Sequence, residues 1–354
     1  MPSTPFLLII FLIDKEVTMV QSMTDAFHAL PSASAIYITG AGVQYPFGMA
    51  HGFSDESTQK KLTVDTPFRI ASNTKTFLAA AFLRLWEQDA LSLDDDITKY
   101  LNPRYQRTLS ELGYDLNTIT LRHLLSHSSG LFDHANDAYL VKVINNPSHK
   151  WTREEQIAHY AEQGFPVIPA GKRFIYSDTG YILLGDILSQ FMRKNMATAV
   201  RELLHFQDLN LPQTWWEDLE PSPIPLKTRA RQFTGEHEGT YIDASMDTFG
   251  GGGLVMTTLE LAKFTADLFE DRVYSHPSTL KEMKWQGSHT GAANYRLGLM
   301  AEETSLGTLY YHLGYWGSVA YYLPEKQIAI AGFTTQRNTR EDLIAIIKEA
   351  FKRL

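Results

Sequence analysis

Ser72 and Lys75 stand three residues apart in the stretch Ser-Asn-Thr-Lys, a spacing that suits nucleophilic catalysis. Apolar residues at helical spacing follow to about residue 88, so Ser72 is predicted to cap or open a helix, with Lys75 one turn on and on the same face. The helix N-terminus would favour negative charge on the serine oxygen, and the ammonium group would lie beside it. The pattern alone fits an ordinary capped core helix equally well.

Length and composition describe an ordinary globular protein with room for a large core. The chain has 354 residues, which allows one or two domains, and 44% of them are hydrophobic and 20% charged. Its net charge of −8 argues against nucleic acid or an anionic membrane as a main partner. The sequence contains no cysteine, which excludes disulfides, thiol catalysis and thiolate metal sites.

The apolar run at residues 6–13 is too short to span a bilayer as a helix, but it is a candidate signal-peptide core. No Lys or Arg precedes it, and the charged residues 14–16 follow at once, so a buried strand is the alternative. The sequence therefore leaves open a cytoplasmic or a periplasmic or secreted location. It leaves the oligomeric state open as well.

Patterns along the chain predict strands and helices that are grouped rather than alternating. Runs of strands with segregated helices favour an α+β fold over a doubly wound parallel sheet. We expect an antiparallel sheet flanked by helices, formed by residues 1–70 and 240–354, a mainly helical inserted domain at 71–239, and an active site in the cleft between them. The predicted helices are 17–30, 119–127, 154–162, 181–192, 259–269 and 341–354, and the predicted strands are 35–39, 43–53, 308–313, 318–323 and 328–334.

Four consecutive glycines at residues 250–253 form a predicted turn before a helix. A phosphate-binding loop is also rich in glycine, but no Gly-Lys-Ser/Thr follows here. Close packing of the backbone against another element is therefore the favoured interpretation.

Three further motifs join the Ser-x-x-Lys sequence. Leu-Leu-Ser-His-Ser-Ser-Gly spans residues 124–130, Tyr-Ser-Asp spans 176–178, and His-Leu-Gly spans 312–314 at the end of a predicted strand. In this order, with the Gly-Gly-Leu turn, they resemble the serine hydrolase family of class C β-lactamases, D-alanyl-D-alanine carboxypeptidases, D-aminopeptidases and β-lactamase-fold esterases. The resemblance covers roughly residues 66–334. It implies a β-lactamase/transpeptidase-like sheet with an inserted helical domain.

The resemblance also implies a role for each motif. Ser72 would attack an acyl carbonyl and form an acyl-enzyme that water then hydrolyses, while Lys75 and Tyr176 would handle the serine proton. The backbone N–H groups of Ser72 and Tyr315 would form the oxyanion hole. No metal or organic cofactor is implied, and the partner would be a small-molecule substrate. The motif residues that would bind this substrate are Asp178, His312 and Gly314.

Two departures from the β-lactamases bear on the substrate. Asp178 stands where many relatives have asparagine, and a carboxylate there would raise the pKa of Lys75 and make it a poorer base. Our hypothesis is that Tyr176, with its pKa lowered by Lys75, is the working base. His312 replaces the lysine that helps to bind a substrate carboxylate, and a histidine is only fractionally charged near neutral pH.

Both departures favour small esters or amides, or substrates with a free amino group, as in an esterase or a D-amino-acid amide or peptide hydrolase. The alternative is a class C-type β-lactamase or a D-alanyl-D-alanine carboxypeptidase. A second alternative is a non-catalytic ligand-sensing or scaffold protein of the same fold. The intact serine, lysine and tyrosine argue against it.

Other catalytic classes fit the sequence less well. No serine has glycine two residues away on both sides, as the nucleophile elbow of an α/β-hydrolase usually requires. The spacing of His123, His127 and His134 could suggest a metal site, but no His-Glu-x-x-His pattern is present. A role for His127 in ordering the loop before Gly130 is favoured.

Overall fold

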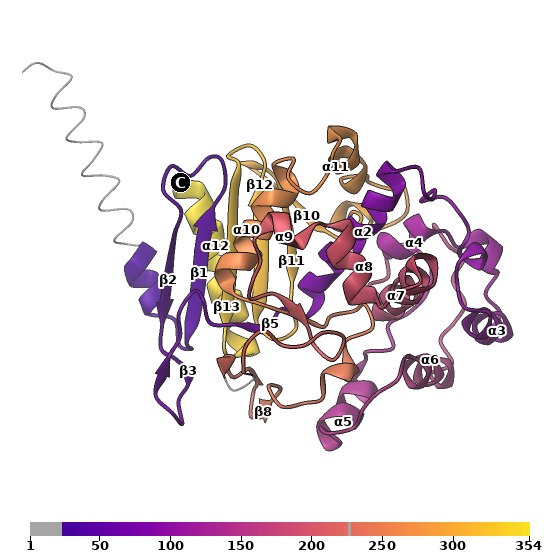
Figure 1. Ribbon diagram of the computed structural model, residues 1–354, viewed down its shortest axis with the longest axis horizontal. Coiled ribbons are helices and arrows are strands. Elements are labelled where there is room, and N and C mark those ends of the chain that lie inside the picture. Colours follow the sequence, from indigo (N-terminus) through magenta and orange to yellow (C-terminus); the bar gives the residue numbers. More distant parts are fainter. Residues whose placement is uncertain (1–22, 226–227) are drawn as a thin grey trace, which may run out of the picture.

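A six-stranded antiparallel sheet lies on one side of the protein, and most of the helices lie on the other (Figure 1). The computed structural model describes residues 23–225 and 228–354. The strand order is β10-β11-β12-β13-β1-β2, so the N-terminal hairpin pairs with the last strand of the C-terminal meander. The strands of this sheet are β1 (Ser34–Thr39), β2 (Phe47–His51), β10 (Met300–Thr304), β11 (Gly307–Leu313), β12 (Ser318–Leu323) and β13 (Ile328–Thr334).

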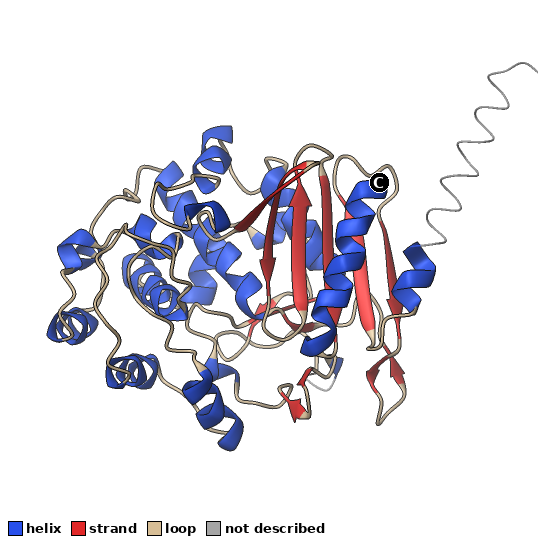
Figure 2. Cartoon of the chain, turned by 180° about the vertical axis from the view of Figure 1, so that it is seen from behind, coloured by secondary structure: helices blue, strands red, loops and turns tan. Residues whose placement is uncertain are grey.

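The side chains of the sheet alternate between two apolar layers, as the two-residue period of a strand requires. In β1, Ile36 and Ile38 belong to the layer that includes helix α12 (Arg340–Arg353). Ala35 belongs to the other layer, with helix α10 (Thr258–Phe269). Figures 1 and 2 show these two helices on opposite faces of the sheet.

Helix α2 (Thr74–Glu87) is buried over nearly its whole length. Apolar residues and alanine occupy most of its positions, which is typical of a helix in the core rather than at the surface. It packs against α7, α8 and α11. The other helices on this side of the large sheet are α3 (Pro103–Glu111), α4 (Leu121–Leu125), α5 (Asp137–Asn145), α6 (Arg153–Glu162), α7 (Asp178–Met192), α8 (Met196–Leu203), α9 (Phe206–Leu209) and α11 (Pro277–Met283).

A smaller, three-stranded sheet joins the segments that lead into the predicted site. Strand β5 (Phe68–Arg69) pairs with β9 (Leu254–Met256), which also pairs with β6 (Trp215–Trp216). Because β5 leads into Ser72 and β9 directly follows the four glycines, this pairing brings the serine turn and the glycine turn together. Two short ribbons pair β3 (Phe53–Asp55) with β4 (Lys60–Lys61) and β7 (Phe233–Thr234) with β8 (His237–Glu238).

The structure confirms the α+β fold and the antiparallel meander. The four glycines pack closely, as expected, because a β-carbon on Gly250 would lie 2.2 Å from the carbonyl oxygen of Tyr181. Helix α7 begins at Asp178, three residues before its predicted start, so this carboxyl lies in the first turn of the helix. Strand β10 and the three-stranded sheet were not predicted, since strands of two to five residues carry too little alternation to detect.

Of the predicted N-terminal helix, residues 23–28 are helical. Its earlier part and the apolar run at 6–13 lie outside the described residues. The division of the chain into two domains stays a prediction. No helix in the ranges 23–225 and 228–354 has the length and hydropathy needed to cross a membrane.

Candidate active site

Ser72 lies in the turn that leads into helix α2. Residues Ala71–Asn73 form one turn of 3₁₀ helix, and α2 continues from Thr74. Ala71 has a φ of 47°, a left-handed conformation that is strained for a residue with a β-carbon. Ser72 thus opens the helix rather than capping it with its side chain. Its Oγ instead accepts a hydrogen bond from Nζ of Lys75 at 3.0 Å.

Lys75 is fully buried, and its ammonium group is saturated by contacts inside the site. Besides Ser72, Nζ donates to the carbonyl oxygen of Gly251 at 2.6 Å and pairs with Oδ1 of Asp178 at 2.5 Å. Burial lowers the pKa of Lys75, but the nearby acidic groups of Asp178, Tyr176 and Asp247 together outweigh it, and the net pKa lies above the ordinary value. An ammonium group has three N–H donors, so Lys75 has none to spare and cannot accept the serine proton in this state.

Tyr176 lies beside the serine–lysine pair, with its ring centroid 5.1 Å from Nζ of Lys75. Burial raises the pKa of Tyr176, while the positive charge of Lys75 and hydrogen bonding with Ser72 lower it by less. The net pKa is therefore above that of an ordinary tyrosine, and the hypothesis of a lowered pKa is wrong. The attraction of Lys75 is present as expected, but desolvation of the phenolate is the larger effect.

Asp178 is held as a carboxylate by its place in the fold. It is the first residue of α7, whose N-terminus favours negative charge, and Ser177 caps that helix by accepting a hydrogen bond from the N–H of Gly180 at 3.1 Å. Burial raises the pKa of Asp178, but the charge and hydrogen bond of Lys75, with smaller effects of His134 and His312, together lower it by more. The prediction that Asp178 reaches Lys75 and raises its pKa is confirmed.

Two further carboxyl groups, those of Asp133 and Asp247, lie around this ion pair. Oδ1 of Asp133 accepts a hydrogen bond from the backbone N–H of Asp178 at 3.1 Å. A β-carbon on Gly251 would lie 3.0 Å from Oδ1 of Asp247 and 3.3 Å from Oδ2 of Asp178, so glycine leaves the space between these two carboxyls open. Burial, and then the charge of Asp178, raise the pKa of Asp133 and of Asp247 to about 7.

Sequence reasoning missed both of these carboxyl groups. Asp133 comes shortly after the Leu-Leu-x-His-x-Ser-Gly motif, and this position could have marked it. Nothing in the sequence marks Asp247, because it reaches the site only through the fold of the glycine turn.

His312 is buried and carries no charge. It is 1% exposed, with Nε2 2.9 Å from the hydroxyl of Tyr295 and Nδ1 3.1 Å from the carbonyl oxygen of Leu313. Because a carbonyl only accepts, Nδ1 carries the hydrogen and Nε2 accepts one from Tyr295. Burial and the charge of Lys75 lower the pKa of His312 to about 3, so the expected fractional charge near neutral pH is wrong.

Gly314 lets the turn after β11 lie against the serine segment. A β-carbon on Gly314 would be 2.0 Å from Oγ of Ser318 and 2.3 Å from the carbonyl oxygen of Ile70, which is closer than such atoms can approach. Ser318 donates a hydrogen bond to that carbonyl at 2.8 Å and accepts one from Asn73 at 2.9 Å. These contacts hold the turn that carries Tyr315 beside the 3₁₀ turn that precedes α2.

The other histidines singled out in the sequence do not form a metal site. His123 belongs to the capping box of α4, in which its Nδ1 accepts a hydrogen bond from the N–H of Thr120 at 3.2 Å. His127 packs against Tyr176 instead, with their ring centroids 4.3 Å apart. In the described part of the chain, no three His, Asp or Glu side chains form a group that could hold a metal ion.

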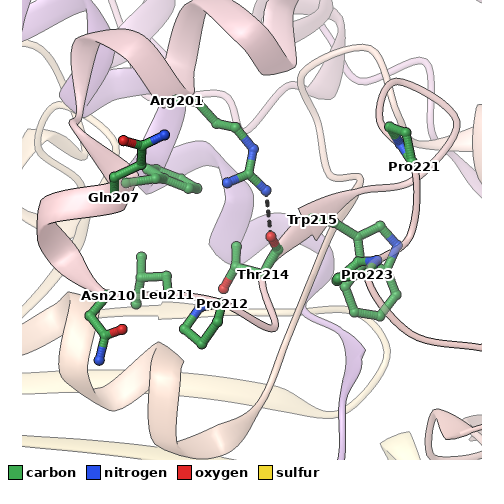
Figure 3. A pocket seen from close by; sticks show the side chains of 10 residues that line it. Arg201, Gln207, Asn210, Leu211, Pro212, Thr214, Trp215, Pro221 and Pro223 are labelled. Carbon is green, nitrogen blue, oxygen red and sulfur yellow. Dashed lines mark hydrogen bonds between the residues drawn. The ribbon is translucent and has the colours of Figure 1, made fainter.

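A pocket of about 440 Å³ lies outside this cluster, between α8, α9 and the proline-rich connection that follows β6 (Figure 3). Arg201 extends into it, but its guanidinium already donates to the carbonyl of Thr214 and to Glu220. None of the predicted site residues lines this pocket. The pocket is therefore separate from the site of Ser72 and Lys75.

Known proteins resemble the chain in sequence over most of its length. A family model described as Beta-lactamase matches residues 20–351. Protein flp of Staphylococcus aureus (strain N315) is 27% identical over 192 residues, or 52% of this chain and 36% of that protein. The Beta-lactamase of Lysobacter lactamgenus is 26% identical over 270 residues, or 76% of this chain and 62% of that protein. The chain thus spans less than two thirds of the length of these curated relatives.

A solved structure shares the fold almost from end to end. The D-amino acid amidase from Ochrobactrum anthropi SV3, complexed with L-phenylalanine, matches with a TM-score of 0.75 and 22% identity. The match covers 95% of this chain and 98% of that one. At this identity the likeness shows that the α+β architecture is common to both.

Proposed function

Because the chain belongs to the Beta-lactamase family, we propose that it is a serine hydrolase that forms an acyl-enzyme on Ser72. The observation that carries this proposal is the 3.0 Å hydrogen bond between Nζ of Lys75 and Oγ of Ser72. A buried ammonium group in this position stabilises the negative charge that develops on the serine oxygen during attack. A scaffold or ligand sensor has no need of such a pair.

Tyr176 is the group that receives the serine proton in this proposal. Lys75 already uses its three donors on Ser72, Gly251 and Asp178, which leaves it no lone pair. Lys75 therefore acts as a fixed positive charge that favours the phenolate of Tyr176. Because burial raises the pKa of Tyr176, the phenolate is scarce at neutral pH, and turnover increases as the pH rises above 7.

The backbone N–H groups of Ser72 and Tyr315 bind the oxyanion of the tetrahedral intermediate. Ser72 lies in the first turn of a helix, where N–H groups have no acceptor within the helix. Tyr315 follows Gly314 in the turn that Ser318 ties to this segment. Two such donors near one oxygen are what acyl transfer requires.

The charges of the site support a small ester or amide that carries a free amino group. Three carboxyl groups surround a single lysine, and the neutral His312 supplies no positive charge for a substrate carboxylate. The side chain of Asp133 is mostly covered, which raises its pKa, but 29% of it is exposed and can be reached from solvent, whereas Lys75 is fully buried. One solved structure of this fold is named a D-amino acid amidase. A D-amino acid amide is a small amide with a free amino group.

A labelling experiment and a substrate panel test this proposal. A fluorophosphonate probe followed by peptide mapping should modify Ser72, and a folded protein that stays unlabelled would contradict the acyl-enzyme. Values of kcat/KM for a D-amino acid p-nitroanilide should exceed those of its N-acetylated form by about tenfold, equivalent to ~1.4 kcal/mol.

The same panel compares p-nitrophenyl butyrate with nitrocefin. The ester should be turned over faster, because it has a good leaving group and no carboxylate to meet the acidic side chains. If nitrocefin has the higher kcat/KM, the substrate is a β-lactam or a D-alanyl-D-alanine peptide, and the inference from Asp178 and His312 fails.

A further inference from the structure

His127 lies against Tyr176, but it has no part in the proposed reaction. It follows the short helix α4, has a φ of 54°, and is 1% exposed. A left-handed conformation at a buried histidine is strained, so the surrounding contacts must hold it there. These contacts converge on one short segment of the chain, residues 175–177.

His127 accepts hydrogen bonds from backbone N–H groups on both sides of Tyr176. Its carbonyl oxygen accepts a hydrogen bond from the N–H of Ile175 at 2.7 Å. Its Nδ1 accepts a second one from the N–H of Ser177 at 3.1 Å. The imidazole ring meanwhile lies over the phenol ring of Tyr176, with centroids 4.3 Å apart and planes 36° from parallel. One residue thus fixes the backbone before and after the tyrosine as well as the tilt of its ring.

The imidazole itself is held in a single chemical state. Because Nδ1 accepts a hydrogen bond, the hydrogen of the neutral ring is on Nε2, which is buried and has no partner among the described residues. Burial, Lys75 and His312 keep the pKa of His127 well below its ordinary value. A neutral imidazole with its basic nitrogen occupied cannot relay the serine proton, so its contribution is to position other groups.

Two more tyrosines close the other sides of the ring. The centroids of Tyr295 and Tyr181 lie 4.5 Å and 5.0 Å from that of His127. The hydroxyl of Tyr181 donates to the carbonyl oxygen of Leu125 at 2.9 Å, and that of Tyr295 meets His312 at 2.9 Å. The ring of His127 therefore cannot swing away from Tyr176 without disturbing a packed aromatic cluster.

We propose that His127 is a positioning residue that holds the hydroxyl of Tyr176 in place beside Ser72 and Lys75. This inference rests on the proposed function, in which Tyr176 takes the serine proton. A displacement of about 1 Å in such a group can lower the rate on the order of a hundredfold.

Two substitutions separate the effect of the hydrogen bond from Ser177 from the effect of the ring contact with Tyr176. His127→Phe keeps an aromatic ring but removes the acceptor for the N–H of Ser177. It should lower the acylation rate and kcat by about 10- to 100-fold, with KM changed by less than about threefold. His127→Asn keeps an oxygen acceptor and tolerates a positive φ, so it should retain more of kcat than His127→Phe.

A matched control is His159→Phe, which also replaces a buried histidine. His159 lies on α6, where its Nδ1 contacts Lys142 at 3.0 Å. Its loss should leave kcat within about twofold of the wild type, since it touches none of residues 175–177. Thermal unfolding of each variant establishes that it is folded.

A double-mutant cycle with Tyr176→Phe supplies the decisive measurement. In the Tyr176→Phe background, either His127 substitution should change the rate of fluorophosphonate labelling by less than about twofold, because the group that His127 positions is already gone. Equal fold-losses in both backgrounds would overturn the inference. Retention of full activity by Tyr176→Phe or Ser72→Ala alone would instead refute the proposed function, so the two failures are distinguishable.

Discussion

Two buried clusters of charge differ in what their donors contact. In the first, Arg69 and Arg229 share the carboxylate of Glu217, and Nε of Arg69 lies 2.6 Å from it. This arginine cluster donates its remaining hydrogen bonds to the backbone, with acceptors at the carbonyls of Gly239, Thr240 and Ile242.

The second cluster is built around Lys75, and its carboxyl groups outnumber its cations. One buried cation pairs with Asp178, the carboxyl groups of Asp133 and Asp247 lie around this pair, and one of the cation's three donors contacts the hydroxyl of Ser72. The arginine cluster stabilises the packing of the segments that carry Arg69, Glu217 and Arg229 against residues 239–242. The lysine cluster directs a charge at a group that can react. The comparison teaches that neither burial nor an excess of one charge marks a functional ion pair, whereas contact with a nucleophile does.

Removing the nucleophile should produce the largest effect on activity. Ser72→Ala should lower turnover by at least about 10⁴-fold, because no acyl-enzyme can form. The free energy of unfolding should change by only about 1–2 kcal/mol, since only the hydrogen bonding of one partly buried hydroxyl group is lost. Steady-state kinetics and denaturant unfolding of the same preparation give both values. A folded Ser72→Ala protein with most of its activity would remove the basis for calling the lysine cluster catalytic.

Breaking the arginine cluster should instead affect stability most. Glu217→Gln leaves two guanidinium groups buried without a counter-charge, and we expect the free energy of unfolding to fall by about 3–5 kcal/mol. The matched control is Glu202→Gln, because Glu202 pairs with Lys194 and the two side chains are 46% and 44% exposed. That change should cost no more than about 1 kcal/mol in urea unfolding. A similar loss in both variants would mean that the buried triad contributes no more than a surface pair.

Asp178→Asn tests the electrostatic coupling inside the lysine cluster. Its carboxylate raises the pKa of Lys75 and of Tyr176, so removing the charge should lower both values. The acidic limb of the kcat/KM profile should therefore move to lower pH, by up to about one unit. The comparison requires full pH–rate profiles of wild type and variant with one ester. A limb that stays in place or moves upward would show that Asp178 is structural.

Asp247→Asn should produce the smallest effect, on how stability varies with pH. The pKa of Asp247 is about 7 in the folded protein and 3.8 in its ordinary state, so the folded form binds the proton more tightly. Stability contributed by this group is then lost as the pH rises through 7. The variant should raise Tm relative to the wild type at pH 8, and by less at pH 5. An equal change at both pH values would mean that Asp247 does not titrate in this range.

Local spacing was enough to predict much of this protein. The 3.6-residue period of a helix places Ser72 and Lys75 one turn apart whatever surrounds them, and the structure confirms their contact. The two-residue period of strands likewise predicted β11, β12 and β13 to within a residue. The same reasoning predicted that Asp178 would raise the pKa of Lys75, because an attraction between opposite charges needs only their proximity.

Only the tertiary structure decided which buried groups are charged and which are neutral. The protonation of Tyr176 depends on how much water every neighbouring element excludes, and desolvation there exceeds the attraction of Lys75. The same effect makes His312 neutral. Asp133 and Asp247 come from loops far apart in the sequence. Packing around Gly251 brings Asp247 to the ion pair, whereas Asp133 reaches it through the N–H of Asp178. Periodicity is a property of a short segment, whereas desolvation is a property of everything that covers a group.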